Sequence, residues 1–430
     1  MNFNINRLAI YPWGSIFLLF AASLTAAGQD FSVKLSVEEL QLKAERNYPA
    51  AKQYGLIEQS RDFTLANASK GYLPQLGLNA RATYQSEVTQ LPAAMPGVSP
   101  LNKDQYQAVV EVNQIIWDGG AIEAQRRIAK ASSEAELKRA ETELYTVRER
   151  VNQLFFGILL IEEQIRQTDI LILELENNYK RVSAYLENGV ATKSDLDAVR
   201  VEVLRAGQKR EELKMTGITY REMLAALTAD DMVKSGNLIK PSADVSAFTN
   251  GNRRPELALF DAQSHLAESQ ERSINAATMP RLNLFVQGGY GNPGLNMLKN
   301  EFSAYYIGGV RLSWNFGSFY TKGNSIRLLD VKRESINTQR ETFLFNSLLA
   351  ERQQLNEILK FTKQMESDTE IIRLREEIKR AAEKRVEEGI ISVSDLIREI
   401  NAENLARQER ATHEIMHLMA IYSIKYLKNN

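Results

Sequence analysis

Two hydrophobic patterns alternate along the chain. In long stretches apolar residues recur every three or four positions, and in short stretches they occupy every second position. The first spacing places apolar side chains along one face of a helix, and the second places them on one face of a strand. The chain is therefore expected to be mainly α-helical, with a small β part.

The longest helical pattern is expected over residues 120–187 and, at ~1.5 Å per residue, gives a rod of roughly 100 Å. Its apolar seam alternates steps of three and four without a break from Leu137 to Leu186. A seam sustained for this length indicates coiled-coil packing against neighbouring helices. A return helix of about half that length is expected over residues 192–228.

Strict alternation predicts strands at about residues 74–89 and 105–117, and again at about 281–290 and 303–315. The first strand has one clean apolar face, made of Leu76, Leu78, Ala80, Ala82 and Tyr84. The second strand is irregular, because Val110 and Val112 lie on one face whereas Ile115 and Trp117 lie on the other. A β-bulge would reconcile the two pairs, but the sequence does not show one.

A recurring segment indicates that the chain is two copies of one unit. The segment 189–196 reads GVATKSDL and returns as GIISVSDL over 389–396. Each copy is expected to be a turn between two helices, in which glycine ends one helix and Ser194 or Ser394, with the following Asp, caps the next. We predict a first structural repeat over residues 29–236 and a second over residues 237–430. The second contains a helix over 255–276, a long helix over 321–388 and a return helix over 392–428.

Composition and the start of the chain narrow the class of protein. The 53 Lys and Arg nearly balance the 54 Asp and Glu, which argues against nucleic acid as a partner. Residues 1–28 have the layout of a secretory signal peptide, with cleavage expected near Ala27 or Gly28. A membrane anchor is the alternative, but the apolar run from Ile16 to Ala22 is too short to span a bilayer. The chain has no cysteine, so neither disulfides nor a Cys-linked lipid anchor is expected.

The strands predict a membrane segment built by several chains. Four strands do not close a barrel, and an open strand edge is not tolerated in lipid. Three chains would give a 12-stranded transmembrane β-barrel, and two or four chains remain alternatives. Aromatic residues along these strands are candidates for contact with outer-membrane lipid at the interface, with core packing as the alternative; they are Tyr84, Trp117, Tyr290, Tyr305, Tyr306 and Trp314.

The order of these features resembles the TolC-type outer-membrane efflux protein family. The resemblance rests on the helix start at Asn47-Tyr48-Pro49, the strand starts at Leu73-Pro74 and Met279-Pro280, the Trp-x-x-Gly strand ends at Trp117 and Trp314, and the paired Gly-x5-Asp-Leu tips. Tyr48 departs from the usual Asn-Pro of the family. The resemblance implies a homotrimer in the outer membrane of a Gram-negative bacterium, with its helices in the periplasm. It also implies docking on a periplasmic adaptor and an inner-membrane pump, and export of drugs, other small molecules or proteins.

The resemblance also assigns roles to the two tips. Asp395 matches an aspartate that narrows the periplasmic entrance, and Asp195 is its counterpart; helix capping alone is the alternative for both. The next acidic position is Arg398, and the residues that lock the entrance in other members correspond to Val386 and Ile391, so that lock is expected to be missing. The tips are the expected surface for adaptor docking, through Gly189, Val190, Ala191, Lys193, Gly389, Ile390, Ile391 and Val393. Lys193 opposite Val393 would make the tips alternately polar and apolar.

Two other functions are alternatives to a channel. The segment His413-Glu414-Ile415-Met416-His417 matches the H-E-x-x-H zinc motif, but no His, Asp, Glu or Cys follows it as a third ligand. A soluble periplasmic coiled-coil adaptor would explain the heptads but not the four amphipathic strands. We therefore expect no enzyme activity, no catalytic residue, no metal and no cofactor.

Overall fold

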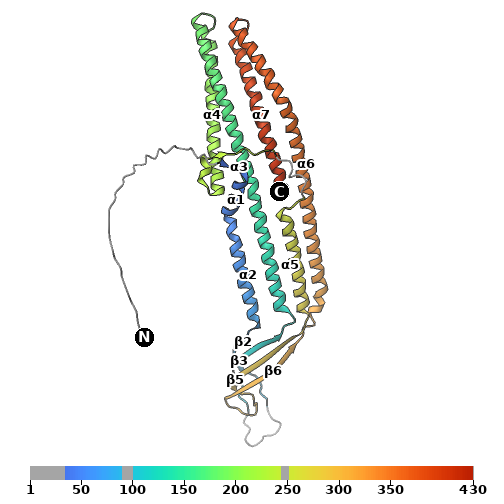
Figure 1. Cartoon of the computed structure of the whole chain (residues 1–430). Helices are drawn as coiled ribbons and strands as arrows, with labels where there is room; N and C mark the ends of the chain where they lie inside the picture. The colour runs from blue at the N-terminus through green and yellow to red at the C-terminus, as the bar shows by residue number, and fades with distance from the viewer. Residues whose placement is uncertain (1–33, 90–99, 244–250, 430) are drawn as a thin grey trace, which may run out of the picture.

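The helices and strands form one long rod with a sheet at one end and two helical turns at the other (Figure 1). The computed structural model describes residues 34–89, 100–243 and 251–429. The predicted signal peptide, residues 1–28, lies outside these ranges. Within them, no helix combines the length and the apolar composition that crossing a bilayer requires.

The first half of the chain supplies four helices and two long strands. They are α1 (Val37–Asn47), α2 (Gln53–Ser69), β2 (Gln75–Tyr84), β3 (Asp104–Trp117), α3 (Ala121–Glu187) and α4 (Lys193–Thr228). The helical segment starts at Pro49, as expected, with one 3-10 turn over Pro49–Lys52 that runs directly into α2. The strand expected to reach residue 89 ends at Tyr84, where the chain leaves the sheet.

The second half follows the same plan. It contains α5 (Pro255–Ala277), β5 (Arg281–Asn292), β6 (Ser303–Ser313), α6 (Ser318–Glu387) and α7 (Val393–Lys428). The last strand stops two residues before its expected end, and α6 begins three residues before its expected start. Short elements lie between the larger ones: β1 (Lys34–Leu35), η2 (Lys70–Tyr72), η3 (Asp231–Lys234) and β4 (Asn237–Leu238).

Two helices, α3 and α6, run the whole length of the rod. Shorter helices pack against each of them, some towards the tips and others towards the sheet. Helix α3 packs against α4 towards the tips and against α2 and α5 towards the sheet. Helix α6 packs against α7 towards the tips and against α5 towards the sheet (Figure 1). The mainly helical fold with a small β part is therefore confirmed, and each long helix is paired with shorter ones along its length.

The four long strands form one antiparallel sheet in the order β2-β3-β5-β6. Between Ile115 and Trp117 the register of β3 against β5 shifts, which places Trp117 opposite Leu282. This β-bulge turns Trp117 onto the face that carries Val110 and Val112, while Ile115 stays on the other face opposite Asn283. This β-bulge, which the sequence does not show, explains the irregular pattern of the second strand.

The largest core lies at mid-rod, where α1 meets α3, α4 and α7. Phe155, Phe156 and Ile158 of α3 are buried there against Leu40 of α1 and Leu418 of α7. Helix α1 begins at a capping box, because the Ser36 hydroxyl accepts from the Glu39 amide and the Glu39 carboxylate accepts from the Ser36 amide. The short parallel strands β1 and β4 also pack into this core.

A second core joins the two helical hairpins towards the tips. Val182 of α3 and Val199 of α4 pack in one cluster with Val386 of α6 and with Val393 and Ile397 of α7. All five side chains are less than 9% exposed. The hairpins therefore approach the tips as one packed unit, and the tip surface is limited to the residues that this core leaves exposed.

Candidate functional site

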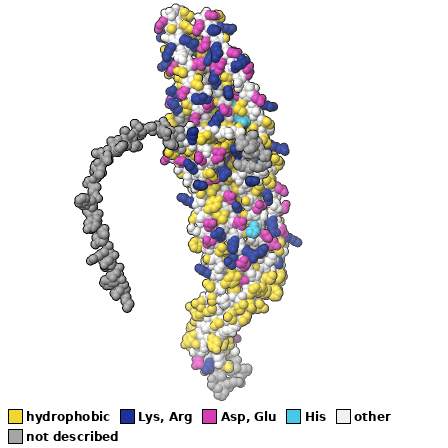
Figure 2. All heavy atoms as spheres, viewed as in Figure 1, with side chains coloured by type: hydrophobic (Ala, Val, Ile, Leu, Met, Phe, Trp, Pro, Cys, Tyr) yellow, Lys and Arg dark blue, Asp and Glu magenta, His cyan; other side chains and the backbone are white. Residues whose placement is uncertain are grey.

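The sheet has one apolar face, which is open to the surroundings. Paired residues of neighbouring strands share a face, so Leu76, Val112, Val286 and Gly288 lie together with Tyr306. Most of the large side chains on this face are exposed, and Leu76 reaches 75%. In Figure 2 hydrophobic side chains gather over the strand end, whereas Lys, Arg, Asp and Glu are spread over the helical part. An exposed apolar face of this extent indicates contact with lipid or another protein.

The opposite face of the sheet is polar and internally connected. The Glu111 carboxylate accepts hydrogen bonds of 2.7 Å from both Asn113 and Gln287, and it lies 3.5 Å from the Arg311 guanidinium. Gln107 of β3 donates to the Tyr305 hydroxyl of β6 across β5. This face is suited to water, because its polar groups have partners and remain accessible.

The predicted interface aromatics divide between the two faces. Tyr84, Tyr290 and Tyr306 are more than half exposed on the apolar face, and the bulge adds Trp117 to it. Tyr305 lies on the polar face, where its ring stands against Gly289 and leaves no space for a Cβ there. Tyr305 is therefore removed from the set that would meet lipid.

Trp314 lies just past the end of β6. Its indole nitrogen donates to the Thr278 carbonyl at 3.0 Å, so a polar anchor holds a ring that is 49% exposed. The arrangement suits a residue at the boundary between an apolar and an aqueous medium.

At the other end of the rod, the two tips have the same backbone structure. Gly189 and Gly389 have φ angles of 70° and 71°, in the left-handed region that the sequence predicts. The amides of Val190 and Ile390 then donate back to Tyr185 and Arg385 at 2.8 Å, which closes the ends of α3 and α6.

The caps of the following helices differ from the prediction. Thr192 and Ser392 are the N-caps, because their hydroxyls accept from the amides of Asp195 and Asp395 at 3.2 Å. The carboxylates of those aspartates accept from the cap amides in return, which completes two capping boxes. The assignment of Ser194 and Ser394 as caps is wrong, since a box needs the hydroxyl three residues before the carboxylate.

The tip residues differ in what they present to the surroundings. Val190 and Ile390 are 60% and 64% exposed, and Lys193 is exposed as well. Ala191 and Ile391 are half-buried against the second core, and Val393 is 5% exposed within it. Val393 is therefore not available for docking. The prediction that an exposed Val393 makes the second tip apolar, opposite the polar Lys193, is wrong.

The two tip aspartates also differ in charge environment. Arg398 lies 3.0 Å from the Asp395 carboxylate, one helical turn on. Hydrogen bonds from the Ser392 hydroxyl and amide lower the pKa of Asp395, and the Arg398 charge adds to the effect. The counterpart of Arg398 in the first tip is Ala198, and within the part of the chain that the structure describes Asp195 has no ion pair.

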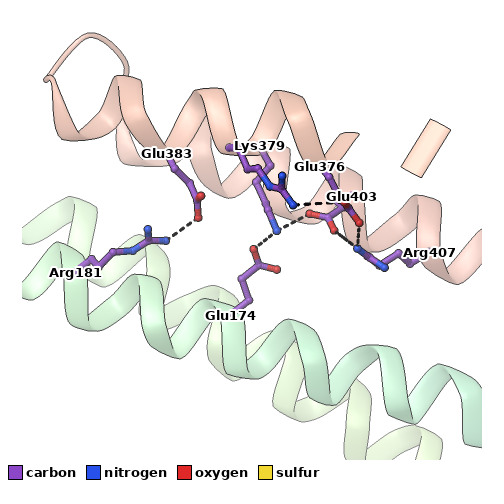
Figure 3. A network of polar contacts seen from close by, with 8 residues as sticks. Glu174, Arg181, Glu376, Lys379, Glu383, Glu403 and Arg407 are labelled. Carbon is purple, nitrogen blue, oxygen red and sulfur yellow. Dashed lines mark hydrogen bonds and ion pairs between the residues drawn. The ribbon is translucent and has the colours of Figure 1, made fainter. Parts of the chain in front are cut away.

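A chain of ion pairs links the hairpins just below the tips (Figure 3). Lys379 of α6 lies 2.5 Å from Glu174 of α3 and 2.6 Å from Glu403 of α7. Arg407 continues the chain, 2.8 Å from Glu403 and in contact with Glu376. The sequence pattern alone does not predict this cluster. One residue in the sequence indicates it. Glu403 lies three residues after Ile400 and three before Ala406, at a position where the heptad spacing predicts an apolar residue.

Opposing effects set the protonation of this cluster. Burial lowers the pKa of Lys379, but the carboxylates of Glu174 and Glu403 outweigh it, so the pKa stays above its ordinary value. Burial likewise raises the pKa of Glu403, and Lys379 with Arg407 brings it below the ordinary value. Lys379 and Glu403 are thus both held in their charged forms.

The H-E-x-x-H segment lies inside α7 and its side chains have other partners. His413 Nδ1 lies 2.9 Å from an Asp368 oxygen on α6, and Glu414 forms an ion pair with Lys240 at 2.5 Å. Burial lowers the pKa of His417. Among the residues of known placement, no three His, Cys, Asp or Glu side chains come together as metal ligands.

The chain is a long helical rod that ends in a sheet with one apolar and one polar face. Residues 58–229 match the family described as outer membrane efflux protein. Its members are outer-membrane export channels, so the family is one of transport proteins rather than enzymes.

Solved structures show the same fold at low sequence identity. A membrane protein from Pseudomonas aeruginosa is 14% identical with a TM-score of 0.68, over 91% of this chain and 93% of that one. The outer membrane protein VceC from Vibrio cholerae is 12% identical with a TM-score of 0.68, over 91% and 96%. The open state of the MtrE outer membrane channel from Neisseria gonorrhoeae is 13% identical with a TM-score of 0.63, over 92% and 89%. No curated protein matches the sequence.

Proposed function

We propose that the chain is the exit duct of a tripartite export system and works as a homotrimer in the outer membrane of a Gram-negative bacterium. The observation that carries the proposal is the sheet, whose apolar face suits lipid and whose polar face suits a water-filled lumen. The helical rod would project from this sheet into the periplasm. Its tips would then lie roughly 100 Å from the strands, within reach of an adaptor and an inner-membrane pump.

The two outer strands of the sheet support assembly into a ring. Strands β2 and β6 each have one neighbour within the described sheet, and an unpaired strand edge is costly in lipid. Pairing β6 of one chain with β2 of the next satisfies both edges. Three chains of four strands give 12 strands, an even number within the range of known barrels. Two or four chains would also satisfy both edges, and the oligomer mass decides among them.

Apolar side chains on two flanks of the rod point to the same assembly. Leu328, Val331 and Phe345 of α6 are 60–69% exposed, and so are Leu56 and Phe63 of α2, at 64% and 69%. Helix α2 leads into β2, and β6 leads into α6. Ring closure through the strands would therefore bring these two apolar flanks together and cover them.

The tips are the proposed docking surface for the adaptor, mainly through Val190 and Ile390. Asp195 and Asp395 are proposed to narrow the entrance, in addition to capping their helices. Because Arg398 partly neutralises Asp395, Asp195 would supply the stronger negative ring.

Membrane fractionation tests the proposal. We expect the mature chain in the outer-membrane fraction, as a detergent-requiring oligomer of three chains whose electrophoretic mobility changes on heating. A soluble monomer in the periplasm would instead support the coiled-coil adaptor and contradict the channel.

Cysteine crosslinking tests the docking surface in the same cells. The native chain has no cysteine, so Val190→Cys and Ile390→Cys each introduce a single reactive site. We expect crosslinks to a periplasmic adaptor from both. Leu56→Cys on α2 is the matched control, because it is equally exposed but lies on the proposed trimer flank and should crosslink only to a second copy of the chain.

A further inference from the structure

The charged residues of the sheet are distributed unequally between its two faces. The four long strands carry Arg81, Glu111, Arg281 and Arg311 on the polar face, opposite Gln107, Gln287, Ser313 and Asn283 respectively. Three positive charges against one negative charge leave an excess of two positive charges per chain. The apolar face carries a single charge, Asp104, at the first residue of β3.

The one acidic group on the polar face is already engaged. Glu111 is 17% exposed and binds Asn113, Gln287 and Arg311. Arg81 and Arg281 are both exposed, and over the residues whose structure is described neither forms an ion pair. The uncompensated charges on this face are therefore both positive.

These two arginines lie at opposite ends of the strands. Arg281 begins β5, next to the helical rod. Arg81 pairs with Gln107 close to the loops at the far end, and it borders a hollow lined also by Gln105, Glu111 and Tyr305. An ion moving along the polar face would meet positive charge on entering and on leaving the strand segment.

We infer that the strand segment of the duct favours anions over cations. The inference rests on the proposed function, because only a closed ring turns the polar face into a lumen. Rings of Arg or Lys select anions in pores, and low-dielectric walls strengthen their field. Three chains would contribute six uncompensated arginines, two from each.

Reversal potentials in planar bilayers across a KCl gradient test the inference. The wild-type oligomer is expected to pass chloride better than potassium. The double variant Arg81→Gln/Arg281→Gln should lose this preference, with its reversal potential moving towards zero. Arg81→Lys/Arg281→Lys is the matched control: it keeps both charges and should keep the chloride preference. Heat-modifiable oligomers of every variant verify that the strands still assemble.

The outcomes separate the inference from the proposed function. Conductance steps without chloride preference, or a preference that both arginine variants leave unchanged, overturn the inference and leave the channel intact. An absence of conductance steps overturns both. If Asp195→Asn/Asp395→Asn moves the reversal potential and the arginine pair does not, the tips set the selectivity and the inference is again wrong.

Discussion

The Lys379 ammonium lies 2.6 Å from a carboxylate oxygen of Glu403, a residue that is only 4% exposed. The same ammonium lies 2.5 Å from Glu174. One cation on α6 therefore joins acidic groups on α7 and α3, which belong to different helical hairpins. Removing one partner of a buried ion pair is costly, because the remaining charge loses its compensation in a medium of low dielectric constant.

Lys379→Met is expected to loosen the contact between the hairpins. Arg407 still compensates Glu403, so we expect the local opening free energy to fall by about 2 kcal/mol, which corresponds to roughly thirtyfold faster amide exchange near residues 376–383 and 399–407. Hydrogen–deuterium exchange measures this change. Lys363→Met is the control, since Lys363 is exposed on the same helix. Equal exchange in both variants would contradict a stabilising role.

The same cluster predicts how its contribution changes with pH. The pKa of Glu403 is below its ordinary value of 4.5, so its stabilisation is complete above that value and is lost as the pH falls through the lowered pKa. The pKa of Lys379 is above 10.5, so its share is complete below that value and is lost only as the pH rises through the raised pKa.

We therefore expect the difference in amide protection between wild type and Glu403→Gln to stay constant from about pH 6 to 9 and to shrink below about pH 4.5. Exchange rates corrected for their intrinsic pH dependence give this difference. A difference that changes through neutral pH would contradict the assignment of this stabilisation to Glu403 and Lys379.

The capping boxes give a test at the level of single residues. Thr192→Ala and Ser392→Ala should each destabilise the first turn of a return helix by about 1 kcal/mol, because the amide of Asp195 or Asp395 loses its side-chain acceptor. Exchange at residues 193–197 and 393–397 reports the fraying. Ser194→Ala and Ser394→Ala should have little effect. Greater fraying in Ser194→Ala and Ser394→Ala would instead support Ser194 and Ser394 as the caps.

The sequence predicts most of the fold, because long seams and strict alternation are local patterns. It identifies the glycine turns for the same reason: Gly189 and Gly389 each follow a long helical pattern. It assigns Tyr305 and Val393 to the wrong surfaces, because their burial depends on Gly289 and on a core shared by four helices. The contact of Lys379 with Glu174 is equally hidden, since the two residues are about 200 positions apart and only the packing of the hairpins joins them.

The two faces of the sheet can be tested with neighbouring residues on β3. Val110 lies on the apolar face opposite Leu78 and Gly288, whereas Val109 lies on the polar face opposite Asn79 and Gly289. In a lipid-facing strand, Val110→Arg should cost about 2–4 kcal/mol near the bilayer midplane, so the fraction of heat-modifiable oligomer should fall. Val109→Arg should assemble normally, because its charge would face water. A loss of assembly in Val109→Arg with normal assembly of Val110→Arg would mean that the sheet faces lipid with its other side. Equal loss in both would mean that β3 tolerates no added bulk, and Val109→Gln against Val110→Gln then repeats the comparison with a smaller side chain.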